Sequence, residues 1–189
     1  MSEDNQHHNE TSLPEDFPFE KVSMTDVPDS VRNAFLTSVG LEEETIRIMG
    51  YDSLATLHHS NGDISYLGIA PNEIGEGINE ENIFVIDVDQ EGSLTGIGNI
   101  RFFREFVGMD DMVGCPFVGY TLTTGPKRQG LGTRRLFTMN TVALRIYGKP
   151  LYSGVHIEQD TARPLWDKLV TDGHAIKLPQ NSEFAYRFK

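Results

Sequence analysis

The sequence of 189 residues has a single cysteine and no long apolar run. One cysteine, Cys115, excludes an internal disulfide framework and favours a reducing compartment, for which the cytoplasm is the default. No apolar stretch approaches the roughly 20 residues that a membrane-spanning helix needs, and the acidic, polar start of the chain lacks the pattern of a signal peptide. No Cys, His and carboxylate cluster has the spacing of a zinc site. These absences leave a single domain with a hydrophobic core, no membrane partner and no metal.

Basic residues are scarce in the first half of the chain. Residues 1–100 contain 3 basic and 20 acidic side chains, whereas residues 101–189 contain 13 and 8. Residues 121–150 hold six of the cations and no acid. The acidic half argues against a nucleic-acid-binding protein, which would need a broad basic surface. It suits a cationic amine as partner, or it serves only solubility.

The beginning of the chain also has few apolar residues. Met1–Glu20 carries six acids and no Lys or Arg, so residues 1–18 are expected to form a disordered acidic tail before a single domain at 19–189. Turn residues, caps and apolar spacing then predict the first elements of that domain. They are a strand at Phe19–Met24, helices at 26–39 and 41–49, a hairpin of Ser53–His59 and Asp63–Ala70 around Asn61-Gly62, a loop at Asn72–Asn82, and a hairpin of Phe84–Asp89 and Leu94–Phe103 around Glu91-Gly92.

The most ordered pattern lies between Phe117 and Tyr147. Phe117–Thr123 is rich in β-branched and aromatic residues, which predicts a strand that Gly125-Pro126 ends. Apolar residues then recur at the spacing of one helix face, and Gly148 ends the helix. That face consists of Leu136, Met139, Ala143 and Ile146.

The segment between this strand and helix, Lys127–Thr133, contains two cations and two glycines. It suits an anion, because the first turn of a helix has unpaired N–H groups and glycine lets a phosphate approach the backbone. Two known phosphate motifs fail here. Leu131-Gly132 stands where a nucleotide triphosphatase loop needs Lys-Ser/Thr, and Arg135 stands where a dinucleotide fingerprint needs its third glycine. The alternative is a helix start whose glycines only fit a turn.

Two motifs in register carry a resemblance to a known family. The first is Lys127-Arg128-Gln129-Gly130-Leu131-Gly132, and the second is Gln159-x-x-Ala162-x-x-Leu165-Trp166-x-Lys168, which follows a predicted strand at Leu151–Ile157. Together they resemble the GNAT superfamily of acyl-CoA-dependent N-acetyltransferases, with Lys for Arg in the first motif, and Gln for Asn and Trp for Tyr in the second. The resemblance covers about Phe84 to Ile176, and the Leu-Trp pair resembles that of bacteriophage-encoded members.

The resemblance implies an α/β (α+β) fold with a mixed, mostly antiparallel sheet of about six to seven strands flanked by helices. It also implies a V-shaped splay between two central strands, here Phe117–Thr123 and Leu151–Ile157, and acetyl-CoA as the cosubstrate in that gap. Backbone groups of the first strand would bind the pantetheine, and the loop would hold the pyrophosphate. The cofactor-binding residues so implied are Leu122, Thr124, Lys127, Arg128, Gln129, Gly130, Leu131, Gly132, Thr133 and Gln159.

The implied reaction is transfer of an acetyl group to a primary amine, on a small molecule or a protein, by direct attack in a ternary complex. The N–H of Leu122 would stabilise the oxyanion. Glu158 is the first choice of base, followed by His156 and Glu105, and Glu158 as a simple helix cap is the alternative. Many relatives dimerise, so a homodimer is compatible with the resemblance.

The departing thiolate needs a proton, which family members often obtain from the Tyr of the Leu-Tyr pair. This chain has Trp166 there, whose indole N–H is no acid at neutral pH. Tyr120, Tyr147 or Tyr152 would substitute, or water would. The same departure motivates the alternative function: a catalytically weak or inactive acyl-CoA-binding module that acts through contact with another protein.

Overall fold

The computed structural model describes residues 17–40, 53–73, 78–124, 130–155, 157, 162–180 and 182–189, and the following statements concern these residues. The predicted tail, apart from its last two residues, and the predicted helix at 41–49 lie outside them. The described chain is an α+β fold with a six-stranded antiparallel sheet in the order β1-β2-β3-β4-β5-β6 and a two-stranded sheet of β7 and β8. The strands are β1 Glu20–Ser23, β2 Ser53–His58, β3 Ile64–Glu73, β4 Ile78–Val88, β5 Leu94–Phe106, β6 Phe117–Thr123, β7 Ala175–Lys177 and β8 Tyr186–Phe188, and the helices are α1 Asp29–Val39, α3 Leu131–Tyr147 and α4 Ala162–Thr171, with a 3-10 turn at Asp110–Met112.

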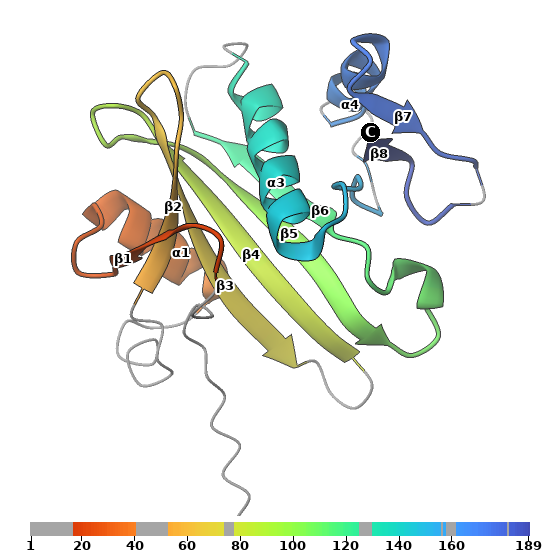
Figure 1. Cartoon of the computed structure of the whole chain (residues 1–189), viewed down its shortest axis with the longest axis horizontal. Coiled ribbons are helices and arrows are strands. Elements are labelled where there is room, and N and C mark those ends of the chain that lie inside the picture. Colours follow the sequence, from red (N-terminus) through yellow and green to blue (C-terminus); the bar gives the residue numbers. More distant parts are fainter. Residues whose placement is uncertain are drawn as a thin grey trace, which may run out of the picture.

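Helices cover both faces of the large sheet (Figure 1). Because side chains alternate along a strand, β4 sends Ile83 and Val85 to one face, where they join the buried core around α3. Phe84 and Ile86 point to the other face and join a second core around α1. Phe35 of α1 packs so closely on β3 that a Cβ on Gly68 would lie 2.2 Å from its ring. The sheet therefore has two apolar faces, and each is buried by its own helix.

Two expectations from turn chemistry are confirmed, and one is wrong. The hairpins β2–β3 and β4–β5 form around Gly62 and Gly92, which both have the positive φ that favours glycine. In the predicted loop at Asn72–Asn82, residues 72–73 and 78–82 are instead strand, with β3 and β4 paired in register from Ala70–Asn82 to Glu73–Asn79, and residues 74–77 lie outside the described residues. Its Gly, Asn and Glu residues favour a loop, but continued pairing of the two long strands outweighs that local preference.

The helices begin and end close to the expected residues. α3 spans Leu131–Tyr147 and ends at Gly148 in the left-handed conformation, as the spacing predicts. α1 begins at Asp29 rather than Asp26, because the Asp26 N–H bonds back to the Ser23 carbonyl in a turn (2.9 Å) and Pro28 is extended. α4 spans Ala162–Thr171 and carries the Ala162, Leu165, Trp166 and Lys168 positions of the second motif.

The predicted strand at Leu151–Ile157 is reduced to single-residue bridges at Tyr152. Tyr152 bridges Phe117 in parallel and Arg187 antiparallel, which links the small sheet to the start of β6. The Val118 N–H donates to the Tyr152 carbonyl (3.0 Å), and no described residue pairs with the outer edge of β6 beyond Val118. The segment after Tyr152 therefore departs from β6 instead of extending the sheet, and the unit of α4, β7 and β8 lies beyond it (Figure 1).

Candidate functional site

No described residue pairs with the outer edge of β6 from Gly119 to Thr123, which we call the open edge. β6 pairs with β5 from Phe117–Arg101 to Thr123–Gly96, with one extra residue at Gly119 opposite the Asn99–Ile100 step. Such a bulge bends a strand, here directly after the last bond to Tyr152. A Cβ on Gly119 would lie 2.1 Å from the Asn99 side-chain oxygen, so this position needs a glycine.

The register decides which backbone groups face this open edge. In an antiparallel pair, successive residues point their N–H and C=O alternately toward and away from the partner strand. The Thr124 N–H donates to the Thr95 carbonyl (3.1 Å), so Thr124 and Leu122 point toward β5, while Thr121 and Thr123 point outward. The backbone groups of Leu122 and Thr124, which the resemblance assigns to the pantetheine, are thus directed into the sheet, and so is the Leu122 N–H assigned to the oxyanion. The open edge offers those of Thr121 and Thr123.

The start of α3 is open as well. Gly130 adopts the left-handed conformation (φ 76°), no side chain caps the helix and no acid lies in its first turn. A Cβ on Gly130 would meet no atom within 4 Å, and one on Gly132 would meet only Leu165, at 3.7 Å. Within the described chain the N–H groups of Leu131, Gly132 and Thr133 have no acceptor, since the first bond of the helix is from Arg134 N–H to the Gly130 carbonyl (2.9 Å). This arrangement presents donors and the positive end of the helix dipole to an anion.

Arg135 ties the start of α3 to three strands. Its side chain is fully buried, and it donates to Asp87 Oδ2 (2.8 Å), the Leu122 carbonyl (2.9 Å), Thr123 Oγ1 (3.1 Å) and the Thr95 carbonyl (3.2 Å). Burial lowers the pKa of Arg135, and the Asp87 carboxylate opposes this shift. Room for the guanidinium comes from β5, because a Cβ on Gly96 would lie 2.0 Å from Arg135 Nη2. Arg135 thereby holds the carbonyl side of β6 at the point where the chain leaves for the loop.

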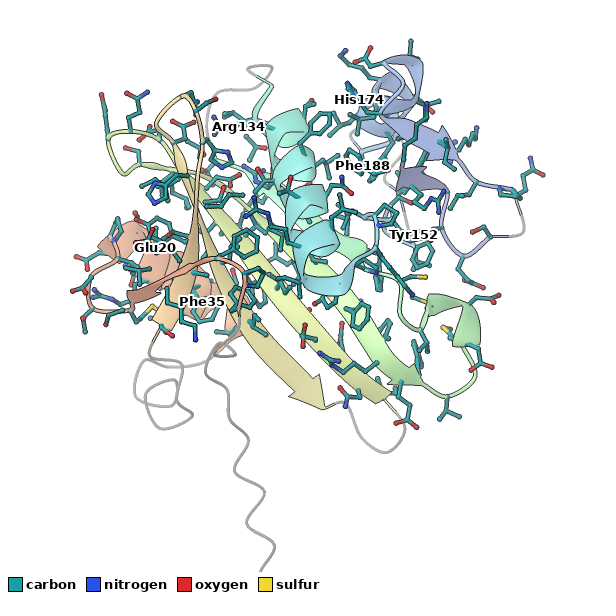
Figure 2. The ribbon with its side chains drawn as sticks, viewed as in Figure 1. Glu20, Phe35, Arg134, Tyr152, His174 and Phe188 are labelled. Atoms are coloured by element: carbon teal, nitrogen blue, oxygen red, sulfur yellow. The ribbon has the colours of Figure 1, made fainter. Side chains whose placement is uncertain are left out.

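The neighbouring arginine is also paired within the protein. Arg134 forms an ion pair with Asp63 in the β2–β3 turn, at the start of α3 (Figure 2). Of the other described cations in residues 121–150, Arg145 lies over the Phe19 ring and Lys149 follows the C-terminal end of α3. The four described cations of residues 121–150 are therefore paired or lie away from the helix start. Lys127, Arg128 and Gln129 lie outside the described residues.

A polar chain extends from Arg135 across the sheet. Ser65 donates to Asp87 Oδ1 (2.6 Å), and the His59 ring nitrogen Nε2 lies 2.7 Å from Ser65 Oγ. Burial lowers the pKa of His59, while the carboxylates of Asp87 and Asp63 act in the opposite direction. The serine lies between the acid and the histidine and is buried, so this is a structural network and has no accessible nucleophile.

The tyrosines considered as acids lie in different environments. Tyr120 is 42% exposed on the β6 face opposite α3. Tyr152 is half-buried against Phe184, at 5.0 Å between ring centroids. No hydroxyl bond to the described residues is present for either. Tyr147 donates to Glu81 (2.5 Å), and burial together with Glu81 raises its pKa far above the ordinary value. It also ends the helix of 17 residues, about 25 Å from Gly130, so it is a poor proton donor for the site.

The candidate bases are only partly placed. Glu158, His156 and the motif residue Gln159 lie outside the described residues. Glu105 is exposed near the far end of β5, roughly 25 Å along the strand from Ile97, the partner of Leu122, and is too remote to act as a base there. Trp166 is 2% exposed and stacks on Tyr186 (5.8 Å between centroids), so it is a core residue.

Comparisons with known proteins found no match. No protein-family model matches the chain, no curated protein matches it, and no solved structure matches it. In the part of the chain that the structure describes, no group of three or more His, Cys, Asp or Glu side chains is placed to hold a metal ion. None of the described helices combines the length and apolar character needed to cross a membrane.

Proposed function

We propose that the chain is an acetyl-CoA-dependent N-acetyltransferase of the GNAT type that acts on a primary amine. The observation that carries the proposal is the continuity of two open features: the unpaired edge at Thr121 and Thr123 leads within a few residues to the uncapped start of α3. A ligand with amides at one end and a diphosphate at the other suits this pair of features. Acetyl-CoA has that order of groups.

The residues present fit such a ligand at three points. Outward N–H and C=O groups of Thr121 and Thr123 would pair with the pantetheine amides as an added strand does. The free N–H groups of Leu131–Thr133 would receive the pyrophosphate, and Gly130 and Gly132 leave the space for it. The parallel bridge from Phe117 to Tyr152, followed by departure of the two segments, supports a V-shaped splay at this place.

Bound acetyl-CoA would supply a thioester whose acetyl carbon is open to a neutral amine. The alkylammonium first gives up one proton to become the neutral amine. A new N–C bond then forms as the C–S bond breaks, the nitrogen loses its second proton and the thiolate gains one. The outward N–H of Thr121 or Thr123 would stabilise the oxyanion, in place of Leu122. Tyr152 at the splay and Tyr120 on the open face are the described candidates for the proton donor, and Glu158 stays the predicted base.

The test is release of free CoA thiol when the full chain is incubated with acetyl-CoA and a panel of polyamines, amino acids, aminoglycosides and peptides. The proposal predicts amine-dependent thiol release together with a product heavier by one acetyl group. Saturable acetyl-CoA binding without product from any amine would contradict catalysis and leave a binding module.

That binding module is the second candidate, and the burial of Trp166 favours it. The indole at the family tyrosine position lies in the core against Tyr186 and Phe188, so that position provides no proton donor. Tight CoA binding without turnover, together with recovery of a specific partner protein, would select this function.

A further inference from the structure

Arg187 of β8 has no counter-ion among the described residues. Its Nε is buried without an acceptor, and no other buried side-chain nitrogen or oxygen in the described residues is in that state. The described arginines that reach into the large sheet each meet a carboxylate: Arg101 meets Glu80, Arg104 meets Glu81, Arg134 meets Asp63 and Arg135 meets Asp87. The Arg187 guanidinium lies over the Tyr152 ring, with its carbon 5.9 Å from the centroid. Because a buried donor without a partner is costly, the site calls for an acceptor.

Arg187 ends a row of side chains on one face of the sheet. Register places Arg101 beside Phe117, Phe117 beside Tyr152, and Tyr152 beside Arg187. The Arg101 guanidinium lies over the Phe117 ring (5.5 Å) as Arg187 lies over Tyr152. The residues on either side of Arg187, Tyr186 and Phe188, belong to the core that contains α3 and α4, so Arg187 points to the opposite face.

This row lies where β6 opens. The bond from Val118 to Tyr152 is the last along that edge, and Tyr120 and Leu122, 42% and 55% exposed, follow on the face opposite α3. The start of α3 occupies the other face, where Thr123 Oγ1 meets Arg135. An amine that attacks a group held at the β6 edge would therefore approach from the face of Tyr120, Tyr152 and Arg187. Tyr152, labelled in Figure 2, lies between the start of β6 and β8, both of which it bridges.

We propose that Arg187 binds a carboxylate of the amine acceptor, so that the preferred acceptors are amines that also carry a carboxylate, such as amino acids. This inference rests on the proposed acetyltransferase function. The Nε and Nη of one guanidinium edge match the two oxygens of a carboxylate. In Arg187 the Nε is buried without an acceptor. The two terminal nitrogens also have no hydrogen bond to the described residues, but they are not enclosed as the Nε is, so they reach solvent. The Tyr152 ring lies beside that guanidinium, and its hydroxyl has no hydrogen bond to the described residues.

A carboxylate on the acceptor narrows what the net charge suggests. The acidic first half of the chain suits a cationic amine, and the side chains beside the open edge on this face include a cation that meets no described carboxylate. A phosphate of CoA is a poorer occupant, because the free helix N–H groups that suit phosphate lie on the other face, at the start of α3. A carboxylate on the acceptor satisfies both the charge and the position of Arg187.

The test uses L-lysine and cadaverine, which differ only by one carboxylate. In the full chain, the side-chain ¹⁵N–¹H signal of Arg187 Nε, assigned by its loss in Arg187→Gln, is followed during titration with each compound. We expect the signal to move with L-lysine and to stay in place with cadaverine. In turnover assays, Arg187→Gln should lower kcat/KM for L-lysine by roughly tenfold to a hundredfold and leave cadaverine unchanged.

Two further variants separate binding from folding. Arg187→Lys keeps the charge but lacks the planar edge, so it should fall between the wild type and Arg187→Gln. Arg145→Gln is the matched control, because Arg145 also lies over a ring, that of Phe19, with no described carboxylate. Arg145→Gln should leave kcat/KM unchanged for both L-lysine and cadaverine.

The outcomes distinguish this inference from the function on which it rests. An Arg187 signal that ignores L-lysine, or that moves equally with cadaverine, overturns the carboxylate site. An unchanged ratio of the two substrates in Arg187→Gln does the same. A signal that moves with L-lysine alone, in a protein that neither binds nor uses acetyl-CoA, overturns the transferase and leaves the carboxylate site in place. Movement with inorganic phosphate but not with L-lysine would assign the site to phosphate instead.

Discussion

Arg135 Nη1 donates to the Leu122 carbonyl at 2.9 Å, and this bond joins the first turn of α3 to the strand that precedes the loop. The same guanidinium is held by Asp87 of β4. The open edge of β6 and the open start of α3 thus keep a fixed relation through one buried side chain. If both bind parts of one ligand, Arg135 positions them without touching it.

Asp87→Asn tests this arrangement. Arg135 is fully buried, so loss of the carboxylate leaves an uncompensated charge in the core and should lower the free energy of unfolding by about 3 kcal/mol or more. Urea denaturation of the full chain measures the change. Asp172→Asn is the matched control, because it breaks the exposed Lys168–Asp172 pair and should cost less than about 1 kcal/mol. Equal effects of the two substitutions would show that the Asp87–Arg135 pair contributes little to the free energy of unfolding.

Gly132→Glu tests the helix start. A side chain here meets only Leu165 at 3.7 Å, so the fold should tolerate it, while the added carboxylate fills and repels the space for a diphosphate. Titration calorimetry should show acetyl-CoA affinity lower by roughly tenfold or more. Leu144→Glu adds the same charge to the exposed side of α3 near its other end and should leave affinity unchanged. Normal acetyl-CoA affinity in Gly132→Glu would show that the start of α3 does not bind the diphosphate.

Proline substitutions test the direction of the β6 backbone groups. Thr121→Pro removes an N–H that faces the open edge, which a strand at the edge of a sheet tolerates. We expect the variant to fold and kcat to fall by roughly a hundredfold, because an oxyanion donor is lost. Leu122→Pro removes an N–H directed into the sheet, so it should lower the melting temperature measurably. The reverse pattern, with Leu122→Pro stable and Thr121→Pro unfolded, would refute the register argument.

His59 should make stability depend on pH. Burial lowers its pKa below the ordinary 6.5, so the unfolded chain takes up a proton at a higher pH than the folded chain does. Stability should therefore fall as the pH drops through about 6.5 and level off below the folded pKa. Urea midpoints across that range should vary less in His59→Gln, whereas His58→Gln, which changes an exposed neighbour, should follow the wild type. Parallel curves for all three proteins would mean that His59 does not titrate differently on folding.

Much of the fold follows from local chemistry, and the exceptions follow from distant contacts. Asn61-Gly62 and the apolar spacing along α3 are local signals, and both hold in the structure. The strand conformation of the described residues in Asn72–Asn82 depends on the continued pairing of β3 with β4, and the turn residues of this segment do not predict that pairing. The sequence pattern shows Arg135 only as a mismatch to a glycine motif. Its buried position against three strands depends on the space that Gly96 leaves, some 40 residues earlier in the chain.

The candidate site shows the same division. The strand, the glycines and the helix start are visible in the sequence, but the phase that turns Thr121 and Thr123 outward needs the bond of Thr124 to Thr95. Arg187 gives no sequence signal, because its position depends on single-residue bridges from β6 through Tyr152 to β8. Local pattern thus identifies the segment, and the pairing of distant strands decides which of its atoms are free.

The proposed function requires that one ligand joins the β6 edge to the start of α3. Backbone ¹⁵N–¹H shifts of the full chain during titration with acetyl-CoA measure this, since each amide reports its own contact. We expect saturable shifts that are largest at Thr121, Thr123, Gly132 and Thr133, with smaller shifts at amides directed into the sheet, such as that of Leu122. Absence of saturable shifts, or shifts confined to other parts of the molecule, would contradict it.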